Sequence, residues 1–259
     1  MLLNKIEKLK KRFINGEVLL INKPLNWTSF QVVKKIKSIL YQKLAIKKIK
    51  IGHSGTLDPL AEGLLVICSG KMTKIISEIQ NYKKSYEATI TLGATTPSFD
   101  LETPFNKMYC FDHVNEKLIN ETRKKFIGEI YQKPPIFSAL KIQGKRLYEY
   151  ARINKHVEIK SRKVNIYKFE IIKVILPNID FKIKCSKGTY VRSIANDFGE
   201  NLGSGAYLSK LKRTEIGKFK LTNPKKLVNL KNILMINYKL ENFNFFKTFI
   251  TNLAMYDEI

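Results

Sequence analysis

Two short segments of the sequence hold residue types that can carry out chemistry. The first runs from Gly52 to Pro59 and contains His53 and Asp58 between a Lys-rich stretch and an apolar run. Its glycines permit tight turns, and Pro59 keeps Asp58 out of the helical region. An acid and an imidazole on such a loop are candidates for catalysis. Two other interpretations stay open: Asp before Pro is an ordinary helix start, and a lone His is more often structural.

The second segment, Lys187 to Arg192, places Tyr190 and Arg192 in the first turn of a predicted helix. A helix N-terminus carries partial positive charge, so an Arg there breaks a local rule unless an anion lies nearby. A carboxylate would accept hydrogen bonds from both the guanidinium and the helix amides, and it would stay ionised as a nucleophile. The alternative is an Arg that faces solvent.

The elements around the first segment are predicted as strand, helix, loop and strand. Residues 17–21 are a buried-strand candidate that ends at Lys23-Pro24. Thr28 and Gln31 form a capping box that opens a helix. Residues 64–68, after the loop, form a second buried strand. The apolar positions of the helix face inward, and they are Val32, Val33, Ile36, Ile39 and Leu40.

The rest of the chain interleaves strands and helices. Residues 86–92 alternate, with Tyr86, Ala88, Ile90 and Leu92 on one face. We predict a charged helix over 112–126, strands over 164–175 and 179–185, and a helix over 191–202 that Thr189 caps and Gly203 closes. There is no strict β-α-β rhythm and no internal repeat, so the predicted fold class is α+β with a mixed sheet.

Composition points to a folded protein that binds a polyanion. The 259 residues include 47 Lys or Arg and 22 Asp or Glu, a net charge of +25, with 44% hydrophobic residues. Nucleic acid is the commonest partner for so basic a domain, although an AT-rich genome would also enrich Lys. Three scattered Cys and three His make a disulfide scaffold or a zinc site improbable. With no long apolar run, we expect a cytoplasmic protein. We expect residues 1–13 to form a basic amphipathic helix or a frayed arm. A segment of this kind more often has its charged face in solvent than bound to a partner.

Taken together, the segments resemble the TruB family of tRNA pseudouridine synthases, in order, from about Gly16 to Phe219. The first motif matches Leu20 to Pro24 with Trp27-Thr28-Ser29, and the catalytic loop matches Gly52 to Ala61. This sequence departs from the usual family residues at Asn22, Asn26, Ser54 and Ser98. Gly is common at the position of Asn26, and Asn tolerates the left-handed turn there. Further matches lie at 84–86, 92–93, 96–100, 132–135, 138–141, 144–146, 185–192 and 203–219.

The resemblance implies an enzyme that isomerises uridine 55 in the T loop of tRNA to pseudouridine, without cofactor or metal. Asp58 matches the family's catalytic aspartate, which either attacks C1′ or assists a glycal route. Arg192 matches the arginine that pairs with this carboxylate. Tyr86 matches a tyrosine that stacks on the target base and is a candidate proton acceptor, although a phenol is a poor base at neutral pH. Its alternative is a core tyrosine.

Because the target base must be flipped out of the tRNA, the family also needs a pocket that replaces lost stacking. His53 matches a histidine that contacts the flipped nucleotides, Tyr190 and Leu211 match pocket-lining positions, and Lys23 matches a motif lysine with a supporting role. The implied fold is the pseudouridine synthase fold, a mixed, mainly antiparallel sheet flanked by helices and loops.

The resemblance gives residues 1–222 as the catalytic domain, with a thumb-like RNA-binding insertion at about 134–160. Its phosphate contacts would include Lys145, Arg146, Arg152 and Lys155. Residues 223–259 are expected to form a short helical appendage and not a full PUA domain. We expect a monomer that binds the tRNA T arm, with no membrane and no obligatory protein partner. The alternatives are a non-catalytic RNA-binding or tRNA-folding factor on the same scaffold and a guide-RNA-dependent relative.

Overall fold

The structure is a computed structural model that describes residues 2–153, 155–222 and 227–229. The chain divides into two compact units, the first formed by 1–82 and 212–259 and the second by 83–211. Strand β12 (Ala206–Ile216) starts in the second unit and ends in the first. None of the helices within the described ranges is long and apolar enough to cross a membrane.

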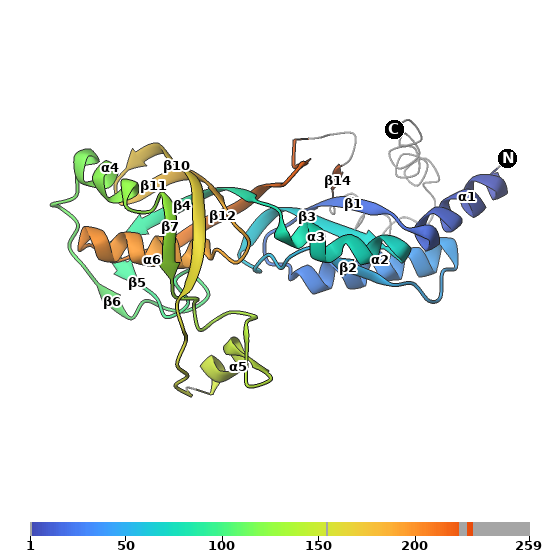
Figure 1. Ribbon diagram of the computed structural model, residues 1–259, viewed down its shortest axis with the longest axis horizontal. Helices are drawn as coiled ribbons and strands as arrows, with labels where there is room; N and C mark the ends of the chain where they lie inside the picture. The colour runs from blue at the N-terminus through green and yellow to red at the C-terminus, as the bar shows by residue number, and fades with distance from the viewer. Residues whose placement is uncertain (1, 154, 223–226, 230–259) are drawn as a thin grey trace. The chain divides into compact units, whose positions relative to one another are not determined.

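The first unit is built on a sheet in the order β14-β1-β3, with β2 paired to β3 and β13 to β12 (Figure 1). Strands β1 and β3 are antiparallel, as are β2 and β3, while β1 and β14 are parallel. Its elements are α1 (Leu2–Asn15), β1 (Val18–Lys23), α2 (Ser29–Leu44), β2 (Ile51–His53), β3 (Ala61–Ser69), a 3₁₀ helix (Gly70–Ile75), α3 (Ile76–Asn81), β13 (Phe219–Lys220) and β14 (Leu227–Asn229).

Both faces of β3 are buried, which explains its continuous apolar run. Leu65 and Ile67 pack with β1 and α2 in one cluster, while Leu64 and Val66 pack with Ile79 of α3 in another. A strand covered on both faces needs apolar residues at every position. The capping box predicted for α2 is present, with both Thr28–Gln31 bonds formed.

Helix α1 corrects the expectation of a solvated N-terminal face. Leu9 and Phe13 are 5% and 1% exposed, and both belong to the cluster under α2. Leu9 and Phe13 of α1 therefore pack against the core of the first unit, while Lys8 and Lys11 are exposed.

The second unit is an antiparallel sheet in the order β4-β11-β10-β7, with α4 and α6 packed beside it (Figure 1). With the parallel β1–β14 pair of the first unit, the chain has mixed but mainly antiparallel strand pairing, which confirms the predicted α+β class. Its elements are β4 (Lys84–Leu92), β5 (Ala94–Thr95), β6 (Lys107–Met108), α4 (Glu116–Lys124), β7 (Gly128–Gln132), β8 (Lys141–Ile142), β9 (Lys145–Arg146), α5 (Leu147–Arg152), β10 (Arg162–Ile175), β11 (Asn178–Cys185) and α6 (Val191–Leu202).

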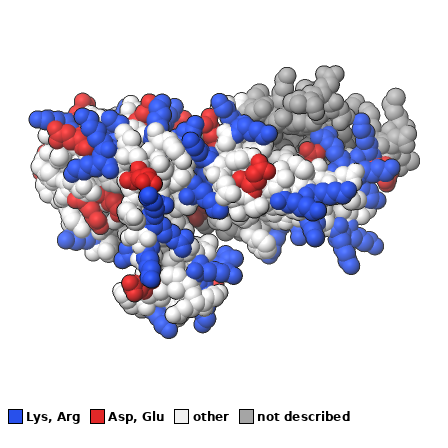
Figure 2. All heavy atoms as spheres, viewed as in Figure 1, with Lys and Arg blue, Asp and Glu red and all other residues white. Residues whose placement is uncertain are grey.

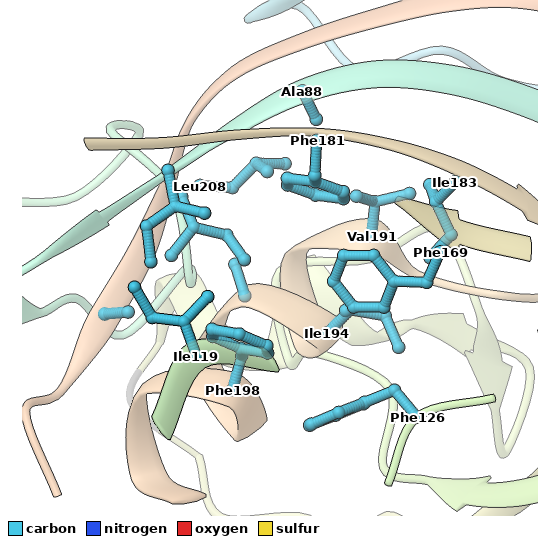
Figure 3. Packing of buried hydrophobic residues seen from close by; sticks show 14 of the residues in the cluster. Ala88, Ile119, Phe126, Phe169, Phe181, Ile183, Val191, Ile194, Phe198 and Leu208 are labelled. Atoms are coloured by element: carbon cyan, nitrogen blue, oxygen red, sulfur yellow. The ribbon is translucent and has the colours of Figure 1, made fainter. Parts of the chain in front are cut away.

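Aromatic rings fill the core of the second unit (Figure 3). Phe169 of β10 lies 5.0 Å from the ring of Phe181 and 5.8 Å from that of Phe198. Phe126 completes the group at 5.7 Å from Phe198. Such tilted contacts add about 0.5–1.5 kcal/mol per pair beyond burial. The aromatic group thus joins α6 to the strands that precede it.

Three local predictions for this unit need correction. Helix α4 begins at Glu116, later than expected, because the Asn115 side chain accepts from Leu118 N and caps it. Helix α6 is not capped by Thr189: its N-cap is Tyr190, and the Thr189 hydroxyl donates to Ser186 O. The polar face of β4 is also more deeply buried than the alternating sequence of this strand predicts.

That face carries Thr89 and Thr91, which are 6% and 8% exposed. The Thr89 hydroxyl donates to Asp180 at 2.6 Å, and that of Thr91 hydrogen-bonds with Asn178 and Ser209. Hydroxyl groups buried in this way need partners, and the neighbouring strands supply them.

Candidate active site

The candidate residues divide between the two units, and each set is described within its own unit. Lys23, His53 and Asp58 lie in the first. The second unit holds the remaining candidates, Tyr86, Tyr190, Arg192 and Leu211.

Asp58 lies on the loop that joins β2 to β3, and its side chain is half-buried. The helix start that Asp-Pro also permits is absent here: Pro59 and Leu60 form a turn, and strand β3 begins at Ala61. Ala61 N donates to Asp58 O at 3.1 Å. The loop thus presents the carboxylate from a tight turn between two strands.

The backbone is held firmly on both sides of Asp58. Before it, the Ser29 hydroxyl donates to Leu57 O at 3.0 Å and accepts from Leu57 N at 2.8 Å. After it, Pro59 O accepts from Asn26 N at 2.8 Å and from Lys23 Nζ at 3.4 Å. Asn26 has φ 63°, which confirms the left-handed turn predicted there. Bonds to both neighbouring residues preorganise the position of the acid.

Lys23 is fully buried at the end of β1. Besides Pro59 O, its ammonium donates to Trp27 O at 2.6 Å and to Pro24 O at 2.9 Å. Burial lowers the pKa of Lys23 to about 8, while the charge of Asp58 opposes that shift. The Lys23 side chain thus ties the β1–α2 turn to the Asp58 loop.

Arg213, which sequence reasoning missed, is a second buried cation behind the same loop, with only 2% exposure. Its guanidinium donates to Leu64 O at 2.8 Å, Gly55 O at 3.1 Å and Thr56 O at 3.3 Å. Gly63 makes the approach possible, because a Cβ there would lie 2.3 Å from Arg213 O. Strands β3 and β12 therefore run close enough for Arg213 to reach the loop.

His53 ends β2 and is partly buried. Gly55 N donates to its Nδ1 at 3.3 Å. Burial and the charge of Arg213 lower the pKa of His53 below its ordinary value, so the ring is neutral at neutral pH. The bond is the one expected of a structural histidine, although the residue is only partly buried.

In the second unit, Arg192 is 4% exposed, which excludes the solvent-facing alternative. The position of Arg192 at a helix start predicted an anion close to it. Asp100 is such an anion, and its Oδ2 lies 3.5 Å from Arg192 Nη1. The guanidinium also donates to Ser98 O at 3.1 Å and Phe137 O at 2.9 Å. Asp100 was not a candidate, although it lies within one of the matched segments.

Tyr190 is positioned by Gln132, which is 1% exposed. The Gln132 side chain accepts from Tyr190 N at 2.8 Å and donates to Tyr190 O at 3.1 Å. This amide thus holds the main chain of the residue at which α6 begins. Tyr86 of β4 and Leu211 of β12 are half-buried and pack against the edge of the aromatic core. Tyr86 is thus not fully internal.

The segment expected to act as a thumb carries the β8–β9 hairpin and α5. Leu147, Tyr150 and Ala151 are the buried residues of α5. Its four candidate cations, Lys145, Arg146, Arg152 and Lys155, are all exposed, and Figure 2 shows basic side chains around this segment.

The helical appendage expected at 223–259 lies largely outside the described residues, and the three residues described there form β14. In the described part of the chain, no three His, Cys, Asp or Glu residues group as metal ligands.

The lowered pKa of Lys23 predicts a pH-dependent stability. Between about pH 8 and the ordinary value of 10.5, the folded protein holds Lys23 neutral and the unfolded chain holds it charged. The unfolded state then binds more protons, so stability rises with pH through this window and is constant below it. The wild type should gain about 2–3 kcal/mol relative to Lys23→Met. Urea unfolding of both proteins from pH 7.5 to 10.5 measures this difference, and a flat difference contradicts it.

The chain is similar to several known proteins. Residues 41–191 match the model described as TruB family pseudouridylate synthase (N terminal domain). A tRNA pseudouridine synthase B from Flavobacterium johnsoniae is 56% identical over 214 residues, covering 82% of this chain and 93% of the relative. One from Parabacteroides distasonis is 51% identical over 209 residues, covering 81% and 89%.

A solved structure is also similar, the crystal structure of a Cbf5-Nop10-Gar1 complex. The similar chain is 30% identical, with a TM-score of 0.66, over 90% of this chain and 56% of that one. The chain thus spans little more than half of that solved protein.

Proposed function

The chain belongs to the TruB family of pseudouridylate synthases, and from that membership we propose that it isomerises uridine 55 in the T loop of tRNA. It is a pseudouridine synthase, and its relatives bear the name of enzymes that act on tRNA. The observation that carries the proposal is 56% identity to such an enzyme across 93% of its length.

In the proposed reaction Asp58 acts on C1′ of the target nucleotide. The N1–C1′ bond breaks, the base turns, a C5–C1′ bond forms, C5 loses its proton and N1 gains one. Asp58 either attacks C1′ directly or assists elimination to a glycal. The anchored backbone on both sides of Asp58 supports this role, because a nucleophile gains rate from a fixed position.

The other candidates have proposed roles that follow the resemblance. Arg192 has the role of the family arginine that partners the catalytic carboxylate, and its burial suits a guanidinium with a fixed orientation. Tyr86 stacks on the target base and is the candidate proton acceptor. His53, Tyr190 and Leu211 contact the flipped nucleotide, while Lys23 positions the loop.

The proposed catalytic domain is 1–222, with 134–160 as the thumb that clamps the T arm. The exposed cations of this segment are suited to phosphate contacts. We further propose that the protein works in the cytoplasm as a monomer, without a protein partner or cofactor. The matched part makes up 56% of the similar chain in the Cbf5-Nop10-Gar1 complex.

Tritium release from tRNA labelled at C5 of uridine tests the assignment, because label leaves only when C5 is substituted. The wild type should release one tritium per tRNA from a transcript with the ordinary T loop. A transcript with cytidine at position 55 should release none, although its other uridines remain. Equal release from both transcripts would place the reaction at another nucleotide. No release from either, with tight binding to both, would favour the RNA-binding factor.

A further inference from the structure

Two adjacent hollows in the first unit are lined by lysines that none of the roles above uses. The larger is about 660 Å³ and lies beside the end of α2, and the smaller is about 290 Å³. They share Lys48, Ile49 and Lys50, so they form one continuous surface, called here the lysine hollow. Its six lysines are Lys37, Lys47, Lys48, Lys50, Lys71 and Lys74.

The charge of the lysine hollow is uncompensated. All six lysines are exposed, and no Asp or Glu is among the described residues that line it. None of the six forms an ion pair with a carboxylate of the described chain. Figure 2 likewise shows many more basic than acidic side chains on the visible face of this unit. Concave surfaces of one sign concentrate field lines and attract an oppositely charged partner.

The lysine hollow lies at the open end of the β2–β3 hairpin, opposite the loop that carries Asp58. Gly70 N donates to Lys50 O at 2.8 Å there, and β2 runs from Ile51 to His53 before the loop begins. At about 3.3 Å per strand residue, the hairpin separates the two features by about 10–13 Å. A strand of nucleic acid carries a phosphate every few ångströms. An RNA bound at Asp58 therefore has several phosphates within that span.

The chemistry of the hollow suits an extended polyanion better than a single small anion. A site for one phosphate or carboxylate gathers convergent, desolvated donors and often an Arg fork. Here the cations are all lysines, exposed and spread along two hollows, and Tyr41, 56% exposed, lies among them. Separate point charges of this kind match successive phosphates of a backbone, and an exposed ring beside them offers a face to a base.

We propose that the lysine hollow binds the ribose-phosphate backbone of the substrate tRNA, as a second contact apart from the catalytic loop and the thumb. The proposal rests on the proposed function for the identity of the RNA. Its binding energy is electrostatic, so it acts on tRNA affinity and on the salt dependence of that affinity.

The test is a triple variant, Lys48→Gln, Lys50→Gln and Lys71→Gln, in the full chain. Binding to an unmodified tRNA transcript is measured by fluorescence anisotropy from 50 to 300 mM KCl. Each lost phosphate contact lowers the slope of log affinity against log salt by about 0.7–0.9. We expect the slope to fall by about 2 and the Kd at 150 mM KCl to rise about tenfold. Thermal unfolding should stay unchanged, because the three side chains are exposed.

A matched control removes the same charge elsewhere, with Lys117→Gln, Lys124→Gln and Lys125→Gln at or next to α4, all exposed. Equal weakening by the two triple variants would reduce the effect to net charge and overturn the proposal. An unchanged slope in the lysine hollow variant would also overturn it. Because this experiment measures tRNA binding directly, its result is independent of tritium release. A failure to detect catalysis would not overturn the proposed binding surface, and a failure to detect binding by the lysine hollow would not overturn the proposed reaction.

Discussion

The variant Asp58→Asn should bind tRNA as tightly as the wild type and form pseudouridine at least about 10⁴-fold more slowly. Asn has nearly the same shape and fits the turn that Ser29 and Lys23 hold through Leu57 and Pro59. It lacks the negative charge needed to attack C1′ or to assist loss of the base. Tritium release under single-turnover conditions measures the rate, and filter binding measures the affinity.

Glu62→Gln is the matched control for Asp58, because this carboxylate lies four residues away on β3 and is exposed. It should keep the wild-type rate. If Asp58→Asn retained more than about a tenth of the activity, another residue would have to be the nucleophile. If instead both variants lost activity equally, the effect would come from the charge of the loop region and not from one carboxylate.

The second large effect is on stability: Arg192→Met should lower the free energy of unfolding by about 3–5 kcal/mol. The substitution leaves Asp100 buried without this cation and removes hydrogen bonds to Ser98 O and Phe137 O. Breaking one partner of a buried ion pair costs more than the pair contributes, because an uncompensated charge remains. Urea unfolding at pH 7 measures the loss.

A double-mutant cycle separates the ion pair from the other contacts of Arg192. Arg192→Met with Asp100→Asn together should cost less than the sum of the single variants by about 1–3 kcal/mol. Arg123→Met is the control, since Arg123 also donates to a carbonyl, Phe169 O, at 2.7 Å. It should cost only about 1 kcal/mol. Additive effects of the two single variants would mean that Asp100 and Arg192 are not energetically coupled.

Much of the fold could be predicted because local signals agree with the final structure. The Thr28–Gln31 capping box starts α2 where expected, and the apolar run at 64–68 lies within β3. The two long strands, β10 and β11, flank the turn at Pro177-Asn178 as predicted. In these segments periodicity, caps and turn residues all favour the same structure.

The contacts that fix the candidate site are long-range, and that is why the sequence did not reveal them. Arg213 reaches Gly55 across 158 positions, and its acceptors are main-chain carbonyls, which every residue has. A basic residue in a strand therefore gives no signal of this role. The sequence did contain one signal for Asp100, because the position of Arg192 predicted a nearby anion and Asp100 lies in a matched segment. The sequence could not single out Asp100 among the acidic residues, because only the fold brings it next to Arg192.

The loop at Asp58 is held through its main-chain atoms, and this affects which substitutions the loop can accept. Arg213 and Lys23 bind the carbonyls of Gly55, Thr56 and Pro59, and Ser29 binds the main chain of Leu57. An exchange of side chain at an exposed position such as Thr56 leaves every one of these bonds in place. The path of the loop thus depends on residues outside it, so an exposed side chain such as Thr56 is free to change, whereas Ser54 and Leu57 are buried and Gly55 has φ 139°.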